Sequence, residues 1–156
     1  MFNYALMNYQ GKGIHRNKPE AAKYYKMGSD QGDLHCMYNY GMMLMKGDGI
    51  KADKEEGMKY ISQSAEKGDI KSNFKYSQIL EKKGTKDEIK GAIRHYKQGA
   101  KNGDVRCMHR YANILYSGKG VHENKKEAAE YYKMAADKNY GPSMQAYATM
   151  LKEGDG

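Results

Sequence analysis

The sequence predicts an all-α protein made of stacked helix pairs, and three observations lead to this fold class. The dipeptide Gly-Asp recurs at Gly32-Asp33, Gly68-Asp69 and Gly103-Asp104, with a period of 36 and then 35 residues. Each period holds two stretches with the apolar spacing of amphipathic helices. Glycines interrupt the chain between these stretches. Periods of about 20 to 50 residues are typical of solenoids, whose repeats bury their apolar faces only by stacking.

The period is also visible at single positions and over longer segments. A tyrosine followed by a small residue recurs at Tyr4, Tyr40, Tyr76, Tyr111 and Tyr147. The segments that begin at Gly11 and Gly118 lie 107 residues apart and agree at 14 of 23 positions. Agreement of this extent excludes chance, so we expect the same structural unit along the whole chain.

The first helix of each repeat is predicted from an apolar stripe that ends in glycine. In the second repeat the stripe has the spacing i, i+4, i+7, i+8 and i+11, at Cys36, Tyr40, Met43, Leu44 and Gly47. The segments Gly47-Asp48-Gly49 and Gly118-Lys119-Gly120 should end their helices, since glycine tolerates the positive φ of a helix C-terminus.

The second helix of each repeat is predicted from a narrower stripe of alanine and tyrosine. Its spacing is i, i+3, i+4, i+7 and i+8 at Ala128, Tyr131, Tyr132, Ala135 and Ala136. Short polar residues suited to the N-cap precede it, at Asn17, Asp53 and Asn124.

The Gly-Asp pairs are predicted to join one repeat to the next. The glycine should end the second helix, and the aspartate should accept hydrogen bonds from free amides of the following helix. Pro142 falls where a first helical turn should be, and its missing N–H costs little there.

The charge and cysteine content narrow the classes of function. The chain has 27 Lys and Arg against 19 Asp and Glu, a net charge of +8, but no block of five or six like charges. Scattered lysines indicate solvated helix faces, and nucleic acid is not the favoured partner. No stretch approaches the roughly 20 apolar residues of a membrane span.

Cys36 and Cys107 share one repeat position, which indicates small buried residues. Two stacked repeats would place them about 20 Å apart, too far for a disulfide. Two cysteines favour a reducing compartment, the cytoplasm.

These motifs together resemble the Sel-1-like repeat, a relative of the tetratricopeptide repeat. The resemblance rests on small-x-x-x-Tyr-small, Gly-x-Gly, the capping Asn, Ala-Ala-x-Tyr-Tyr-x-x-Ala-Ala and Gly-Asp, and extends over residues 1–156. It implies a right-handed α/α superhelix of about four helix pairs followed by an unpaired helix. The third repeat departs from the pattern, because its inner loop at Lys83-Gly84-Thr85 is one residue shorter and His95 replaces an aromatic residue.

We expect one repeat domain over residues 1–156. Its parts are a partial unit at 1–34, full units at 35–70, 71–105 and 106–141, and a partial unit at 142–156. Both ends fall inside a repeat and lack polar caps, which suggests a piece of a longer array. The chain should be a monomer or stack end to end through its uncapped terminal helices.

The residues that could support catalysis do not form a pattern. His15, His35, His95, His109 and His122 lack partners at metal-ligand spacing, so we expect no metal, no cofactor and no enzyme activity. Gly11-Lys12-Gly13 lacks the rest of a phosphate loop. Ser72-Asn73-Phe74-Lys75 matches the Ser-x-x-Lys spacing of penicillin-binding enzymes, but the equivalent positions of other repeats lack the lysine.

The outward face of the first helices is the predicted binding surface. On the second repeat this face holds positions 38, 39, 42, 45 and 46. Aromatic residues and Met beside Arg, Lys and Asn suit a protein or peptide partner. The same aromatic residues could equally pack against the neighbouring repeat. The predicted partner-binding residues are Phe2, Tyr38, Asn39, Met42, Phe74, Lys75, His109, Arg110 and Tyr116.

The resemblance implies a noncatalytic protein-interaction scaffold or adaptor that holds a peptide or helix on its concave face. Two alternatives stay open. The repeats could be an accessory segment of a larger enzyme, such as a kinase or a cell-wall or β-lactam-related hydrolase. The +8 charge could instead bind acidic partners through a basic surface.

Overall fold

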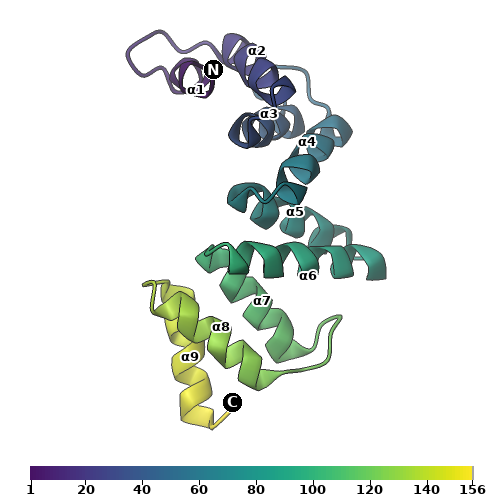
Figure 1. Ribbon diagram of the computed structural model, residues 1–156, viewed down its shortest axis with the longest axis vertical. Helices are drawn as coiled ribbons and strands as arrows, with labels where there is room; N and C mark the ends of the chain where they lie inside the picture. The colour runs from purple at the N-terminus through teal and green to yellow at the C-terminus, as the bar shows by residue number, and fades with distance from the viewer. Residues whose placement is uncertain (156) are drawn as a thin grey trace. The chain divides into compact units, whose positions relative to one another are not determined.

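The computed structural model describes residues 1–155, and this part of the chain folds into nine helices without a strand (Figure 1). The helices are α1 (Phe2–Gln10), α2 (Lys18–Asp30), α3 (Leu34–Lys46), α4 (Lys54–Glu66), α5 (Ile70–Lys83), α6 (Lys86–Lys101), α7 (Val105–Ser117), α8 (Lys125–Ala136) and α9 (Gly141–Glu153). The predicted all-α class, with four helix pairs and a ninth helix, is confirmed.

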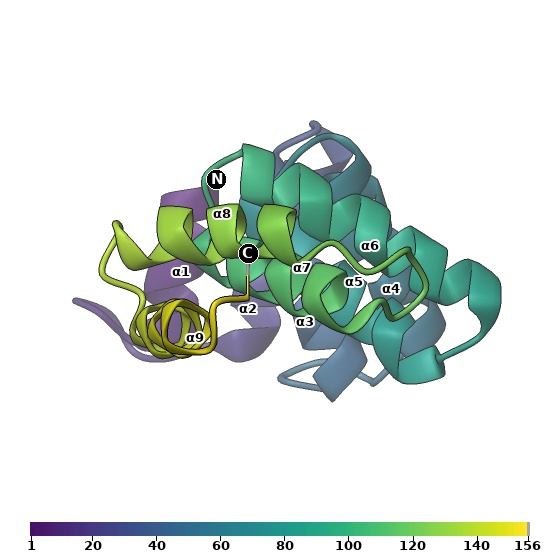
Figure 2. The ribbon, with the colours of Figure 1, turned by 90° about the horizontal axis from the view of Figure 1, so that it is seen from below.

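The chain divides into two compact units, residues 1–72 and 73–156, and α5 begins in the first and continues in the second. We call them the N-terminal and C-terminal units. In the N-terminal unit α2 packs against α1 and α3, and α4 packs against α3. In the C-terminal unit α7 packs against α6 and α8, and α9, seen nearly end-on in Figure 2, packs against α8.

The predicted caps are confirmed at the start of the helices. Asn17, Asp53 and Asn124 accept hydrogen bonds from the backbone amides of Glu20, Glu56 and Glu127, at 2.9–3.1 Å. The aspartates of the Gly-Asp pairs accept equivalent bonds at the next repeat, where Asp33, Asp69 and Asp104 bind the amides of Cys36, Ser72 and Cys107. These bonds satisfy amides that a helix N-terminus leaves free.

Helix ends follow the predicted breaks. Gly47 and Gly49 have φ of 69° and 81°, in the left-handed region that favours glycine. The Gly-Asp glycine of the fourth repeat is replaced by Asn139, which adopts φ 62° and ends α8 in the same way. Thr85 forms a capping box with Glu88, which the sequence had not indicated and which compensates for the shortened loop of the third repeat.

Each helix pair is held by one edge-to-face ring contact. The ring centroids lie 4.7–5.0 Å apart in four pairs, namely Tyr4–Tyr24, Tyr40–Tyr60, Tyr76–His95 and Tyr111–Tyr131. His95 therefore keeps the ring geometry of the tyrosine that it replaces. It is buried, and its Nδ1 lies 3.0 Å from Asn73 Oδ1, which gives the imidazole the polar partner that burial requires.

Consecutive repeats meet through small side chains. Cys36 and Cys107 are fully buried, and burial raises the pKa of the Cys36 thiol to about 11. A Cβ atom added to Gly28 would lie 2.4 Å from Cys36 Sγ, and one added to Gly99 would lie 2.4 Å from Cys107 Sγ. The prediction that both cysteines are small buried residues is confirmed, and each is matched by a glycine on the preceding helix.

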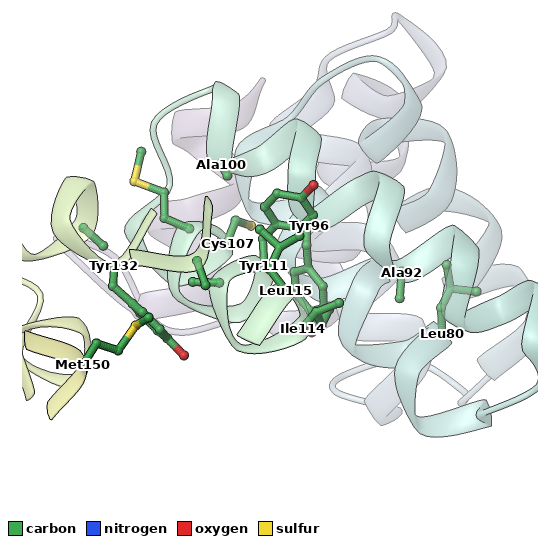
Figure 3. Close-up of a cluster of buried hydrophobic side chains, with 14 residues drawn as sticks. Leu80, Ala92, Tyr96, Ala100, Cys107, Tyr111, Ile114, Leu115, Tyr132 and Met150 are labelled. Carbon is green, nitrogen blue, oxygen red and sulfur yellow. The ribbon is translucent and has the colours of Figure 1, made fainter. Parts of the chain in front are cut away.

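The core of the C-terminal unit forms one continuous cluster (Figure 3). In the figure it runs from Leu80 and Ala92 through Tyr96 and Tyr111 to Tyr132, with Met150 beside it. The buried cluster of the N-terminal unit is smaller and consists of Ala5, Ala21, Ala22, Tyr25, Cys36 and Met43. In both units the core joins first helices to second helices, which leaves the opposite side of the first helices free of that core.

Candidate functional site

The outward side of the first helices is only partly covered. On α3 the inward Met43 and Leu44 are buried, whereas Tyr38, Asn39 and Met42 are half-buried. On α7 the outward His109 and Tyr116 are half-buried and Arg110 is exposed; their inward neighbours are buried, at Cys107, Met108, Tyr111, Ala112, Ile114 and Leu115. We call this side of α1, α3, α5, α7 and α9 the first-helix face of its unit.

The C-terminal unit has a pocket of about 450 Å³ on this face, between α7 and α9 with α8 behind them. The C-terminal pocket contains two of the predicted partner-binding residues, His109 and Tyr116. Tyr132 and Met150, both labelled in Figure 3, belong to the buried cluster and also line this pocket. The full lining is His109, Tyr116, Tyr132, Pro142, Gln145, Ala146, Thr149 and Met150.

The N-terminal unit has a smaller pocket of about 150 Å³. The N-terminal pocket brings together three further predicted residues, Tyr38, Asn39 and Met42. Its lining is Tyr9, Tyr25, Tyr38, Asn39, Met42, Met43, Lys46 and Asp48.

The two pockets occupy the same place in the repeat, because residues 107 apart in the sequence line them. Tyr9, Tyr25 and Met43 correspond to Tyr116, Tyr132 and Met150. The variable wall explains the difference in volume. It consists of Tyr38, Asn39 and Met42 in the N-terminal pocket, and of the smaller Gln145, Ala146 and Thr149 in the C-terminal pocket.

A polar bridge between consecutive repeats borders the N-terminal pocket. The hydroxyl of Tyr9 donates to Asp48 Oδ2 at 2.7 Å, and the ammonium of Lys18 donates to Asp48 Oδ1. The Lys18 Nζ also lies 5.7 Å from the centroid of the Tyr9 ring. Hydrogen bonds from Lys18 and from Tyr9 hold the pKa of Asp48 below its ordinary value.

The same Tyr-Lys-Asp bridge recurs beside the C-terminal pocket. Tyr116 and Lys125 donate to Asp155 at 3.1 and 2.9 Å, and they hold its pKa below the ordinary value in the same way. At the equivalent place in the third and fourth repeats, Glu81 replaces the tyrosine and Lys119 replaces the aspartate, and Lys119 Nζ lies 3.6 Å from Glu81 Oε1. Sequence reasoning missed these bridges, although the 107-residue spacing of all three members was available as a signal.

Two predicted aromatic residues pack between helices and line neither of the two pockets. The Phe2 ring lies 6.1 Å from the Tyr25 ring and 5.6 Å from the His35 ring. The Phe74 ring lies 6.3 Å from the Tyr96 ring, and the guanidinium of Arg106 covers it at 4.3 Å.

His109 occupies the same repeat position but reaches the C-terminal pocket. Its ring lies 5.5 Å from the Tyr132 ring and 5.6 Å from the Tyr140 ring, and its Nδ1 lies 2.9 Å from Ser143 Oγ. Burial and the charge of Arg110 lower the pKa of His109, so the imidazole is neutral near pH 7. The pocket wall formed by this ring is therefore uncharged.

Lys75 and Arg110, the two predicted cations, lie at equivalent positions of α5 and α7. Lys75 is half-buried and Arg110 is exposed. Neither has an ion-pair partner within residues 1–155. Arg110 follows the pocket residue His109 on α7, whereas Lys75 lies on α5, which contributes no residue to the C-terminal pocket.

One buried hydroxyl distinguishes the two pockets. Tyr132 donates to Asn113 Oδ1, whereas the equivalent hydroxyl of Tyr25 is buried and has no hydrogen-bond partner among residues 1–155. The residue of α1 that corresponds to Asn113 is Leu6, which offers no acceptor.

The arrangement gives no support to catalysis at the motifs considered from sequence. Ser72 is fully buried, and its hydroxyl donates to Ser64 Oγ at 2.8 Å, so it is not accessible to a substrate. Within residues 1–155 no three His, Cys, Asp or Glu side chains gather as metal ligands would.

Repeated helix pairs with a recurring pocket on the first helices define a protein of the α/α repeat class. The Sel1 repeat family matches residues 1–33, 34–69, 73–104 and 105–140, and the chain belongs to this family. Sel1 repeats generally act in protein–protein interaction and typically form noncatalytic scaffolds.

Solved structures of similar proteins support the same assignment. A Sel1 repeat protein from Oxalobacter formigenes is 26% identical, with a TM-score of 0.88 over 99% of this chain and 62% of its own. The fold also matches c5321, a protective antigen of uropathogenic Escherichia coli strains with an SLR fold, at 24% identity and a TM-score of 0.84. That match covers 97% of this chain and 33% of the antigen.

The chain therefore spans less than two thirds of the length of each of these structures. No curated protein matches it significantly. None of the helices within residues 1–155 is long and apolar enough to cross a membrane.

Proposed function

We propose that the chain is a noncatalytic scaffold or adaptor segment that binds an extended peptide or a helix of a partner protein on its first-helix face. The observation that carries the proposal is the recurrence of one pocket in both units, lined by residues at equivalent repeat positions. The family role in protein–protein interaction supports the same function. The buried thiols of Cys36 and Cys107 further suggest a reducing compartment, the cytoplasm.

The two pockets have the properties of anchor sites. Each combines tyrosine rings and methionine with a few polar groups, the composition typical of interface hot spots. The Tyr-Lys-Asp bridges hold the loops beside the pockets, so the pockets are formed before a partner binds. Preformed pockets on rigid helices reduce the entropy lost on binding.

The experiment selects short random peptides, displayed on phage, against the full chain and then measures the selected peptides with variants. Met42→Arg and Thr149→Arg place a long charged side chain in the N-terminal and C-terminal pockets. We expect each variant to weaken the peptides that use its pocket by about tenfold or more, as the loss of a hot spot does.

Matched controls carry the same substitution on the second helices. Met27→Arg on α2 and Met134→Arg on α8 change residues that are 41% and 47% exposed and lie outside both pockets. Full binding by the controls, with unchanged helical circular dichroism in all four variants, supports the proposal. Selection that yields no peptide, or peptides equally weakened by the control variants, would contradict it.

A further inference from the structure

A tyrosine recurs at one position of the second helices, and its hydroxyl is hydrogen-bonded in two cases out of three. The three residues are Tyr25 of α2, Tyr96 of α6 and Tyr132 of α8. The hydroxyl of Tyr96 donates to Glu81 Oε2 at 3.0 Å, and that of Tyr132 donates to Asn113 Oδ1. The Tyr25 hydroxyl is buried and has no such acceptor among residues 1–155. Buried polar groups without a partner are rare in folded proteins, so this hydroxyl calls for an explanation.

The first helix α1 supplies no acceptor to this hydroxyl. At the position of Asn113 it carries Leu6, whose side chain is apolar, and at the position of Glu81 it carries Tyr9. The Tyr9 hydroxyl is itself a donor, to Asp48 Oδ2 at 2.7 Å. An acceptor is therefore available from solvent or from a partner, and not from α1.

The unpaired hydroxyl belongs to a residue of the N-terminal pocket. Tyr25 lines this pocket, whose volume of about 150 Å³ is a third of that of the C-terminal pocket and suits one short side chain. Burial raises the pKa of Tyr25 to about 12, so the hydroxyl stays protonated and can donate. Because the hydroxyl is covered, a lining side chain has to shift before a partner group reaches it. Met42 is half-buried, and its unbranched side chain is suited to such a shift.

The loop residue of the following repeat indicates which acceptor suits each tyrosine. In the third repeat the acceptor is the carboxylate of Glu81, and the loop residue is Lys119, whose Nζ lies 3.6 Å from Glu81 Oε1. In the fourth repeat the acceptor is the neutral amide of Asn113, and the loop residue is Asp155. The N-terminal pocket has Asp48 at this place, and its lowered pKa keeps it ionised. A second carboxylate would be repelled there, whereas a neutral amide would not.

We infer that the N-terminal pocket takes the side-chain amide of an Asn or Gln of the partner peptide, whose oxygen accepts a hydrogen bond from the Tyr25 hydroxyl. This inference rests on the proposed function and names the chemistry of the partner. The amide nitrogen is a donor, so the same group can also bind the Asp48 carboxylate in the lining. An apolar side chain of similar size would leave the hydroxyl unsatisfied, and sites built around a hydrogen bond discriminate against such analogues.

The test uses peptides from the phage selection whose binding is weakened by Met42→Arg. We expect these peptides to share an Asn or Gln at one position. Replacing this Asn by Leu, or Gln by Met, removes the acceptor at similar size and should weaken binding by about tenfold. Tyr25→Phe should weaken the selected peptide by the same factor and leave the apolar analogue within about twofold, since both changes remove one hydrogen bond.

Two further variants separate this role from folding. Tyr96→Phe removes the equivalent hydroxyl outside both pockets, so it should leave the peptide affinity within about twofold but lower the melting temperature, because a bond to Glu81 is lost. Tyr25→Phe should not lower the melting temperature, because its hydroxyl has no bond to lose among residues 1–155. Leu6→Asn supplies an internal acceptor and should reduce the preference for the amide over the apolar analogue.

The outcomes distinguish this inference from the proposed function. An apolar analogue that binds as tightly as the selected peptide, or a preference that persists in Tyr25→Phe, would overturn the amide and keep the scaffold. Tighter binding of an Asp or Glu analogue, through pairing with the exposed Lys46 of the lining, would do the same. Selected peptides that are all insensitive to Met42→Arg would overturn this site and keep the C-terminal pocket. The absence of any selected peptide would overturn both proposals.

Discussion

The N-terminal and C-terminal units carry the same repeat, but they differ on the face where the proposed binding takes place. Their buried positions are nearly interchangeable, as the fully buried pair Cys36 and Cys107 shows. Their outward positions are not, since α1 and α3 together carry one Lys, Lys46, and no Arg, Asp or Glu, whereas α7 carries Arg106 and Arg110. Packing therefore constrains which residues occupy the buried positions of each repeat, whereas the outward residues determine the shape and charge of each pocket.

The largest effect is expected where the two units are most alike. Gly99→Ala places a Cβ atom 2.4 Å from the buried Cys107 Sγ, and we expect a loss of about 2 to 3 kcal/mol in the free energy of unfolding. A decrease in stability indicates the steric clash, because replacing glycine by alanine in a helix interior would otherwise stabilise the fold by about 1 kcal/mol. Urea denaturation followed by circular dichroism measures the change.

The fourth repeat indicates a second substitution that should restore the stability lost in Gly99→Ala. At the corresponding positions it pairs Ala135 with Ser143, so Cys107→Ser should restore most of the stability lost in Gly99→Ala. Gly141→Ala, where no atom lies within 4 Å of the new Cβ, should show no loss and serves as the control. An unchanged Gly99→Ala variant would show that shape matching does not limit this interface.

A smaller effect is expected from exchanging the tyrosine partners of the two units. Asn113→Leu gives Tyr132 the environment of Tyr25 and should lower the free energy of unfolding by about 1 to 2 kcal/mol, since a buried hydroxyl loses its acceptor. The reciprocal Leu6→Asn should gain up to about 1 kcal/mol by giving Tyr25 an acceptor. Denaturant midpoints of the two variants should therefore move in opposite directions, and a shift of both in the same direction would refute the explanation.

The smallest effect is a dependence on pH that the two Tyr-Lys-Asp bridges share. The folded-state pKa of Asp48 and of Asp155 is lowered, so each bridge stabilises the fold above the ordinary aspartate value and loses this contribution as pH falls below about 4. Asp48→Asn with Asp155→Asn should flatten the decline in melting temperature over this range. A decline as steep as in the parent chain would contradict the assignment.

The fold could be predicted from sequence because each cap and helix break recurs in several repeats. The caps at Asn17, Asp53 and Asn124 and the glycine breaks recur at fixed spacing, so one weak local pattern is supported by the others. The pockets could not be predicted, since they depend on side chains of different repeats, and the bridges were missed because only their 107-residue spacing indicated them. Lys18, for example, meets Asp48 thirty residues away. The predicted site residues were chosen from their outward positions alone, which does not separate Phe74, packed between helices, from His109, which lines a pocket.

The central claim is that binding takes place on the first helices, and a titration followed by nuclear magnetic resonance tests it most directly. The ¹⁵N-labelled chain is titrated with a peptide that the phage selection yields and that Thr149→Arg weakens. We predict shifts concentrated at Arg110, Gln145 and Thr149, with little change at the outward residues of α6 and α8. Shifts centred on α6 and α8, or spread evenly over both sides of the unit, would contradict the claim.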